Sequence, residues 1–265
     1  ETSDLEINPN TLIHNIYAKK INLGLSDDAL FMNPDFNPYS PKENLQSWKQ
    51  NQPFYFAFPE SKIRSELPLF KINTNNASLC ATGTLFIDSM YPAQSLFGFS
   101  TLNDFEEKIF KYSDHFYYFR GDFLVEDFVK NEKGYIPTYT RHLVLSENSG
   151  HLCLTEKAGI NKNFEKYSDT GFRIASKTDK YENKISYEYN SGGLLIGIAN
   201  QKGERIAFEY NDLRNITLVK TPKSSWTLEY DSLQNLKTIQ STERGIFHLS
   251  HESKTYPHLL TSLET

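Results

Sequence analysis

The clearest pattern in the chain is an alternation of apolar and polar positions that recurs in its C-terminal half. We take Tyr189, Tyr210 and Tyr230 as position 0 of three consecutive units, which are spaced by 21 and 20 residues. Apolar side chains stand at positions −4, −2, +6 and +9 of every unit. They are Ile185, Tyr187, Leu195 and Ile198; Ile206, Phe208, Ile216 and Val219; and Trp226, Leu228, Leu236 and Ile239. The same pattern in three consecutive units indicates a true repeat, and such a repeat predicts an architecture of stacked, similar structural units.

Each unit predicts one antiparallel β-hairpin. Positions −4, −2 and 0 share one face of a strand, because strand side chains alternate with a period of two. The residue at +1, which is Asn190, Asn211 or Asp231, begins the turn, since Asn and Asp bond to their own backbone and tolerate left-handed conformations. Position +6 starts the returning strand. Position +9 lies three residues further, so we expect a bulge or the strand end there.

One hairpin is marginal in water, so several must form a long sheet whose apolar face is covered. Either the sheet curls round on itself or other material covers it. The units that flank the repeat are degenerate. Tyr167 precedes the first anchor by 22 residues, but Arg173 and Ser176 occupy its apolar +6 and +9 positions. His251 occupies position 0 after the third unit, and we interpret it as a core substitute for tyrosine.

The pattern divides the chain into an irregular β-rich region, residues 1–140, and the hairpin array, residues 141–265. Apolar runs between turn-rich stretches of the first region predict strands. These runs are Phe54–Phe58, Leu79–Ile87 and His115–Phe119. Short helices are predicted at Lys42–Gln50 and at Asn103–Lys111, the second because Phe105, Ile109 and Tyr112 share a helical face. A Gly-containing turn between His142–Leu145 and His151–Leu154 predicts a further hairpin.

The repeat resembles that of RHS/YD-repeat proteins, whose signature is a Tyr-Asp pair, a turn with Gly, and spaced Leu and Ile. Tyr230-Asp231 matches it, although Gln234 takes the Gly position, and Tyr189-Asn190 with Gly193 matches it with Asn for Asp. The resemblance covers about residues 164–263. It implies tandem hairpins in a long curved sheet, part of a β-shell that in bacterial polymorphic toxins encloses a C-terminal toxin domain.

The same resemblance implies the partners and the location. The partners are the remainder of the protein's own RHS chain and an enclosed toxin domain, and the location is secretion or delivery by a bacterial secretion system. The family's self-cleavage motif is missing, and the chain stops inside a further unit. We therefore expect a fragment or a shortened relative, whose unpaired strand edges invite edge-to-edge self-association.

Composition narrows the function classes. The net charge of −5 leaves no electrostatic footprint for nucleic acid. No apolar stretch is long enough for a membrane span, and no signal peptide is recognisable. Aromatic residues make up 14% of the chain, which favours a packed β fold over disorder. Cys80 and Cys153 are either two buried free thiols, which we favour, or one bridge.

Nothing in the sequence predicts catalysis, a cofactor or a metal site. His248 and His251 point to opposite faces of a strand, and Ser100 lacks the second Gly of a nucleophile elbow. Asp122, Glu126 and Asp127, with apolar residues between them, favour a strand with one wet face over an acid/base pair. We therefore expect a structural, non-catalytic protein; an enzyme in the first 140 residues ranks last.

The alternative function is a carbohydrate- or cell-surface-binding β module. Exposed aromatic rings can stack on sugar rings, and the first region is rich in tyrosine. The candidate stacking residues are Tyr117, Tyr118, Tyr135 and Tyr139.

Overall fold

A computed structural model describes residues 63–75, 79–89, 94–121, 123–132, 134–140, 142–254 and 257–265. These residues are mainly β, in antiparallel sheets, and contain no helix. The predicted strand at Phe54–Phe58 and the predicted helix at Lys42–Gln50 lie outside them. Residue contacts divide the chain into two units. The larger unit holds residues 68–84 and 103–226, and the smaller unit holds residues 1–67, 85–102 and 227–265.

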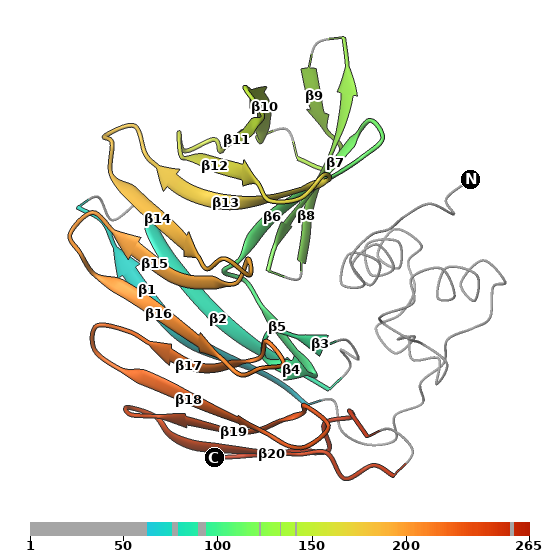
Figure 1. Cartoon of the computed structure of the whole chain (residues 1–265), viewed down its shortest axis with the longest axis vertical. Coiled ribbons are helices and arrows are strands. Elements are labelled where there is room, and N and C mark those ends of the chain that lie inside the picture. Colours follow the sequence, from blue (N-terminus) through green and yellow to red (C-terminus); the bar gives the residue numbers. More distant parts are fainter. Residues whose placement is uncertain are drawn as a thin grey trace, which may run out of the picture. The chain divides into compact units, whose positions relative to one another are not determined.

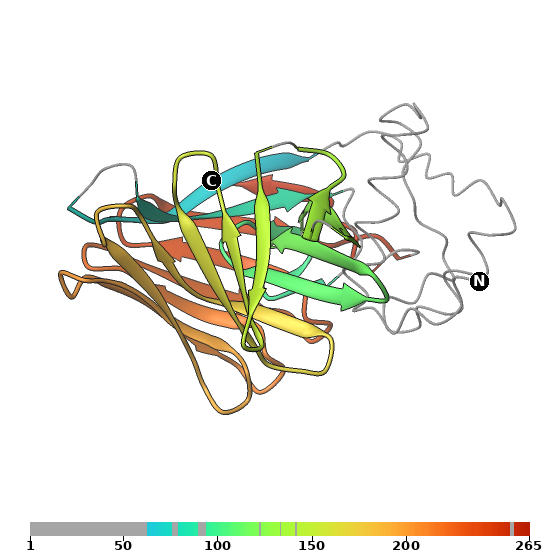
Figure 2. The same ribbon diagram turned by 90° about the horizontal axis from the view of Figure 1, so that it is seen from above.

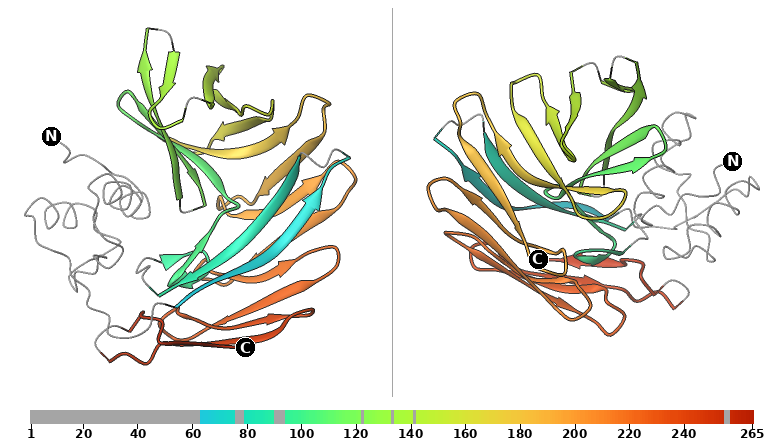
Figure 3. Two further views of the ribbon diagram at one scale, coloured as in Figure 1. Left: turned by 180° about the vertical axis from the view of Figure 1, so that it is seen from behind. Right: turned by 45° about the horizontal axis from the view of Figure 1, so that its top comes forward.

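The larger unit contains a closed ring of eight antiparallel strands, an eight-stranded barrel. They are β6 (Glu107–Tyr112), β7 (His115–Arg120), β8 (Phe123–Asn131), β9 (Gly134–Pro137), β10 (Val144–Asn148), β11 (His151–Thr155), β12 (Asn161–Lys166) and β13 (Gly171–Thr178). Neighbours in sequence pair from β6 to β12, and β13 pairs with both β12 and β6, which closes the ring. Figures 2 and 3 show these green and yellow strands from further sides. Phe116, Phe128, Leu152 and Phe164 fill the interior.

The hairpin array leaves the ring at β13. Residues 171–173 of this strand pair with β6, whereas residues 176–178 pair with β14. The array strands follow one another in sequence order, as the orange and red arrows of Figure 1 show. They are β14 (Lys184–Tyr189), β15 (Leu195–Asn200), β16 (Arg205–Tyr210), β17 (Ile216–Lys220), β18 (Ser225–Tyr230), β19 (Leu236–Ser241), β20 (Gly245–Ser250) and β21 (Ser262–Glu264).

The predicted hairpins are confirmed, and the returning strand has a bulge, but at position +7 and not at position +9, where a bulge or the strand end was expected. Tyr187 pairs with Ile198, but Tyr189 pairs with Leu195, so Ile196 has no partner in the β14–β15 ladder. The same shift leaves Thr217 unpaired in β17. The bulge therefore lies at position +7. It returns positions +6 and +9 to one face, and the side chains at both positions are completely buried in all three units.

The turns share one backbone conformation that the sequence shows only in part. Position +4 has a positive φ in every unit: 82° at Gly193, 68° at Arg214 and 66° at Gln234. The Asx side chain at +1 accepts backbone N–H groups across the turn, as Asn211 Oδ1 does from Asn215 at 2.9 Å. The turn therefore forms around the Asx residue even where position +4 is not glycine.

The anchor hydroxyls join successive hairpins. Tyr210 Oη donates to the carbonyl of Leu195 at 2.6 Å, and Tyr189 Oη donates to that of Ile174 at 2.9 Å. The β15–β16 ladder pairs only residues 197–199 of β15. The tyrosine thus binds the neighbouring strand beside the bulge, beyond the end of the backbone ladder.

A second sheet covers part of the apolar face of the array. It contains β1 (Arg64–Asn73), β2 (Cys80–Asp88) and β5 (Thr101–Asn103). In the larger unit, Phe70 packs edge-on against Phe208 with ring centroids 5.9 Å apart, and Trp226 Nε1 donates to the Leu69 carbonyl at 2.9 Å. A Cβ on Gly83 would lie 2.2 Å from the Phe70 ring, so only glycine admits that ring. The sequence left two ways to cover the apolar face, by curling of the sheet or by other parts of the protein. Here the sheet of β1, β2 and β5 covers it.

The smaller unit contains the hairpin of β3 (Gln94–Ser95) and β4 (Gly98–Phe99). Phe99 forms a parallel bridge with Asn235, in the turn of the third repeat unit. Gly98 lies so close to this turn that an added Cβ would be 2.7 Å from the Gln234 carbonyl oxygen.

The predicted helix at Asn103–Lys111 is wrong. Residues 107–112 form β6, which pairs along its whole length with β7. Ile109 is buried and its neighbours Lys108 and Phe110 are half-buried, which fits the period of two. The spacing of Phe105 and Ile109 suits either structure, and the long-range ladder decides it. The predicted strands at Leu79–Ile87 and His115–Phe119 and the hairpin of β10 and β11 are confirmed.

Replacing Tyr210 by Phe tests the hydroxyl contact between hairpins. The variant keeps the ring and removes the donor to Leu195, so the free energy of unfolding should fall by about 1 kcal/mol in urea denaturation. Tyr181→Phe is the control, because that side chain is 64% exposed and should leave stability unchanged. Equal stability of the two variants would contradict the contact.

Replacing Arg214 by Gly tests the shared turn. The left-handed conformation costs a side-chain-bearing residue about 1–2 kcal/mol, so the glycine variant should unfold at a higher urea concentration. Gly193→Ala is the reciprocal change and should destabilise. Its added Cβ would meet only Arg173 Nη1, at 3.8 Å, so this substitution measures the backbone cost alone. A destabilised Arg214→Gly would refute the shared geometry.

Candidate functional site: a buried charge cluster inside the ring

A carboxylate lies in the interior of the ring, among the apolar side chains. Glu107, the first residue of β6, is 1% exposed. Ile109 pairs with Tyr118 and Glu107 pairs with Arg120, so Tyr118 is the diagonal neighbour of Glu107 on the same face. Tyr118 Oη donates a hydrogen bond to Glu107 Oε2 at 2.5 Å.

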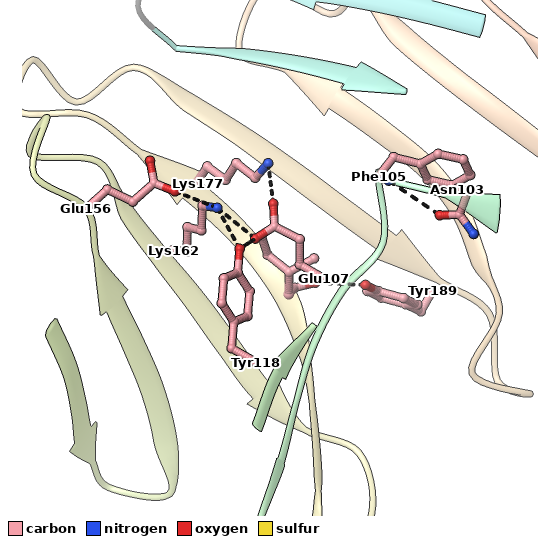
Figure 4. A network of polar contacts seen from close by, with 9 residues as sticks. Asn103, Phe105, Glu107, Tyr118, Glu156, Lys162, Lys177 and Tyr189 are labelled. Atoms are coloured by element: carbon pink, nitrogen blue, oxygen red, sulfur yellow. Dashed lines mark hydrogen bonds and ion pairs between the residues drawn. The ribbon is translucent and has the colours of Figure 1, made fainter. Parts of the chain in front are cut away.

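Lys162 of β12 supplies the first cation of the cluster. Its Nζ lies 2.9 Å from Glu107 Oε2, 2.8 Å from Tyr118 Oη and 2.7 Å from Glu156 Oε1. The contact with Tyr118 is a hydrogen bond that Lys162 donates, and the contacts with Glu107 and Glu156 are ion pairs (Figure 4).

Lys177 of β13 supplies the second cation because of a bulge. Ala175 has no partner in the β12–β13 ladder, and beyond it Lys177 pairs with Lys162. Without the extra residue, the side chain at 177 would point to the opposite face. Lys177 Nζ lies 2.6 Å from Glu107 Oε1, an ion pair that does not meet hydrogen-bond geometry (Figure 4).

The cluster is ionised over the physiological range. Burial alone would raise the pKa of Glu107, but the charges of Lys177 and Lys162 outweigh it and hold the pKa at about 2. Burial would likewise lower the pKa of Lys177 and Lys162, but Glu107 raises both above their ordinary value. Burial and the Glu107 charge raise the pKa of Tyr118. A general acid or base needs a pKa near the working pH, so these groups are suited to fixing β6, β7, β12 and β13 together.

A second, partly exposed cluster lies on the outer face of the ring. His115 Nδ1 is 2.9 Å from Asp127 Oδ1, and the Tyr117 ring lies parallel to the imidazole with centroids 5.7 Å apart. Tyr139 is 53% exposed, and Asp127 contributes to raising its pKa, after burial. Burial and Asp127 also raise the pKa of Tyr117, to about 12.

The loop that carries Tyr139 is fixed by the neighbouring carboxylate. Glu126 is completely buried, and its oxygens accept the backbone N–H groups of Asp127, Thr138, Tyr139 and Thr140 at 2.7–3.0 Å. The sequence interpretation places Asp122, Glu126 and Asp127 on a strand with one wet face. Asp122 lies outside the described residues, and of the other two only Asp127 fits. Glu126 points inward and has a structural role that spacing could not reveal.

The four candidate stacking tyrosines have different surroundings. Tyr117 and Tyr139 share the outer cluster, whereas Tyr118 is 2% exposed and bound within the charge cluster, so no surface ligand reaches its ring. Tyr135 donates to Glu147 at 2.6 Å and packs edge-on against Phe116. The structure therefore brings two of the four tyrosines together.

The repeat anchors take structural positions. Tyr189, Tyr210 and Tyr230 are half-buried, and the guanidinium of Arg173 lies over the Tyr189 ring at 4.0 Å. Tyr167 is 42% exposed, and Gly171 at its +4 position lacks the positive φ of the other units. This agrees with a degenerate unit.

Cys80 and Cys153 are free and half-buried. Across the described residues, no group of three or more His, Cys, Asp and Glu side chains is arranged to hold a metal ion. No helix within the same residues is long and apolar enough to cross a membrane.

In the part of the chain that the structure describes, the fold is an antiparallel β fold in which an eight-stranded ring continues into an array of hairpins. A scan of protein-family models finds no match, and a search of curated proteins finds no significant relative. The RHS/YD resemblance therefore depends on the repeat itself and stays a prediction.

Replacing Lys177 by Met tests the buried cluster. The change leaves the Glu107 carboxylate with one positive charge fewer beside it, so the free energy of unfolding should fall by about 3–5 kcal/mol. Lys184→Met, at an exposed position seven residues on, should change stability by about 0.5 kcal/mol at most.

The acid dependence of the same variants gives a second check. The depressed pKa of Glu107 contributes stability that is present above pH 4.5 and lost as the pH falls towards about 2. Chemical denaturation between pH 5 and about pH 2 should show a smaller loss for Lys177→Met than for Lys184→Met. Parallel pH curves would exclude the assigned pairing.

Proposed function

We propose that the chain is a structural, non-catalytic segment of an RHS/YD-repeat β-shell, resembling the shells that enclose a C-terminal toxin domain of secreted bacterial effectors. One observation carries the proposal: the Tyr-Asx unit recurs with the same turn and the same buried +6 and +9 positions. Each unit uses its tyrosine and its Asx residue to build the sheet, which leaves neither side chain for chemistry.

The ionised cluster supports the same function. Its members neutralise one another inside the ring, and their pKa values are displaced away from neutrality. Such a cluster favours one register of the strands around it, because any slip would leave a buried charge unpaired. Part of the array's apolar face is covered by β1 and β2, so this part of the array would belong to the packed wall of the shell. An enclosed domain would contact other parts of the shell.

The native gene product tests this function. Its denatured mass should far exceed the 30.6 kDa of this chain, and it should migrate as one compact particle that retains a protease-resistant cargo. Tyr210→Ala should increase protease access to the cargo, whereas Tyr181→Ala should not. A stable monomer near 30.6 kDa without cargo would refute the shell.

The outer cluster favours carbohydrate binding as the second candidate function. Tyr117, Tyr139 and Asp127 offer partly exposed rings beside a carboxylate, which is a combination that can stack on a sugar ring and accept its hydroxyl protons. A glycan array should give a signal that Tyr139→Ala abolishes and Tyr181→Ala retains. An array without signal would eliminate this candidate.

A further inference from the structure

The outer face of the ring carries a carboxylate that its own surroundings compensate only in part. The Asp127 side chain is 14% exposed, and both of its oxygens face a single donor, His115 Nδ1, at 2.9 and 3.2 Å. No lysine or arginine among the described residues forms an ion pair with it. A carboxylate has about four acceptor positions, so most of those on Asp127 are available to an external donor. Glu107, inside the ring, instead has two ammonium groups beside it.

Three tyrosine rings surround this carboxylate. Tyr117 is opposite Asp127 in the β7–β8 ladder, so both side chains lie on the same face. Tyr112 of β6 pairs with His115 on that face and is therefore the diagonal neighbour of Tyr117. The pKa of Tyr117 is raised to about 12, first by burial and then by three neighbours, which are Asp127, Tyr139 and Tyr112. The three rings and the carboxylate are thus close enough to act on one ligand.

The loop after β9 holds the third ring in place. Its backbone is tied on both sides of β8, since Thr138 N–H donates to the Asp127 carbonyl at 2.8 Å and Tyr139 N–H donates to Glu126 Oε1 at 2.7 Å. Tyr139 is 53% exposed, whereas Tyr117 and Tyr112 are half-buried, so ring surface remains open to solvent. A surface whose backbone is already fixed loses little conformational entropy when a ligand binds.

We propose that the outer cluster selects a sugar that carries a protonated amino group, a deacetylated hexosamine. The inference rests on the second candidate function, carbohydrate binding, and names its ligand class. The tyrosine rings would stack on the apolar face of the sugar and attract its cation, while Asp127 would accept protons from the ammonium group. A neutral sugar would gain the stacking but not the charge-assisted hydrogen bond. His115, donating from Nδ1 as a neutral imidazole, orients the carboxylate and leaves its negative charge for the ligand.

Calorimetry with two oligosaccharides tests the selectivity. A short glucosamine oligomer and a glucose oligomer of the same length and linkage differ only in an ammonium group or a hydroxyl at each ring. The wild-type chain should bind the glucosamine oligomer roughly tenfold more tightly, because a hydrogen bond to a charged group is stronger than one between neutral groups. Asp127→Asn should remove this preference and leave the affinity for the glucose oligomer unchanged.

Three further variants separate the site from the overall charge of the chain. Asp212→Asn removes the same charge from an exposed position in a turn of the array, and it should keep the wild-type preference. His115→Gln retains an N–H donor for Asp127 and excludes a positive charge there, so it should also retain the preference. Tyr139→Ala should weaken the binding of both oligomers, because each would lose a stacking ring.

The outcomes distinguish this inference from the functions on which it could depend. Equal affinity of the wild-type chain for the two oligomers would overturn the selectivity and leave carbohydrate binding in place, and this comparison needs no variant to fold. An equal loss of preference in Asp127→Asn and Asp212→Asn would assign the preference to net charge and also overturn the inference. Binding of neither oligomer would remove the inference together with the second candidate function. The shell function is tested separately, by the native gene product.

Discussion

The first two repeat hairpins depend on one unpaired residue in the returning strand. Apolar residues at positions +6 and +9 would face opposite sides of a regular strand, and half of their burial would be lost. The extra residue, Ile196 in β15, brings both positions to the core face. The bulge also interrupts pairing with the next hairpin, so the Leu195 carbonyl accepts the hydroxyl of Tyr210 instead. The spacing of the apolar positions therefore requires the bulge, and the anchor tyrosine compensates for the backbone pairing that the bulge interrupts.

The same physical device accounts for the buried charges. The bulge at Ala175 turns Lys177 to the face that carries Glu107. A carboxylate this deeply buried needs compensation from more than one donor, and two ammonium groups and a phenol provide it. The cluster thus ties the closure of the ring at β6 and β13 to the register of β12, since a one-residue slip would separate the opposite charges.

The sequence predicts the array better than the ring, for a physical reason. Hairpin units are local, so period-two alternation and Asx turns reveal them, and the spacing of +6 and +9 even indicates the bulge. The sequence gives no sign that Arg214 adopts the same left-handed backbone conformation as Gly193, because position +4 of the second unit is not glycine. Closure of the ring and the contacts of Glu107 join residues far apart in sequence, which periodicity cannot register. The helix predicted at Asn103–Lys111 is wrong for the same reason. Its apolar spacing fits both a helix and a strand, and the pairing of β6 with β7 decides for the strand.

The contacts also predict that the stability of the array differs between its hairpins. The hydroxyl of Tyr210 donates to the Leu195 carbonyl and so has a partner in the neighbouring hairpin. His251 has the same repeat position but offers an imidazole without a partner at Nε2, next to a three-residue strand. In an array where each hairpin contacts mainly its neighbours, stability is the sum of local contacts. Local opening is therefore expected first where a titratable group replaces the tyrosine, at the end of the described sheet.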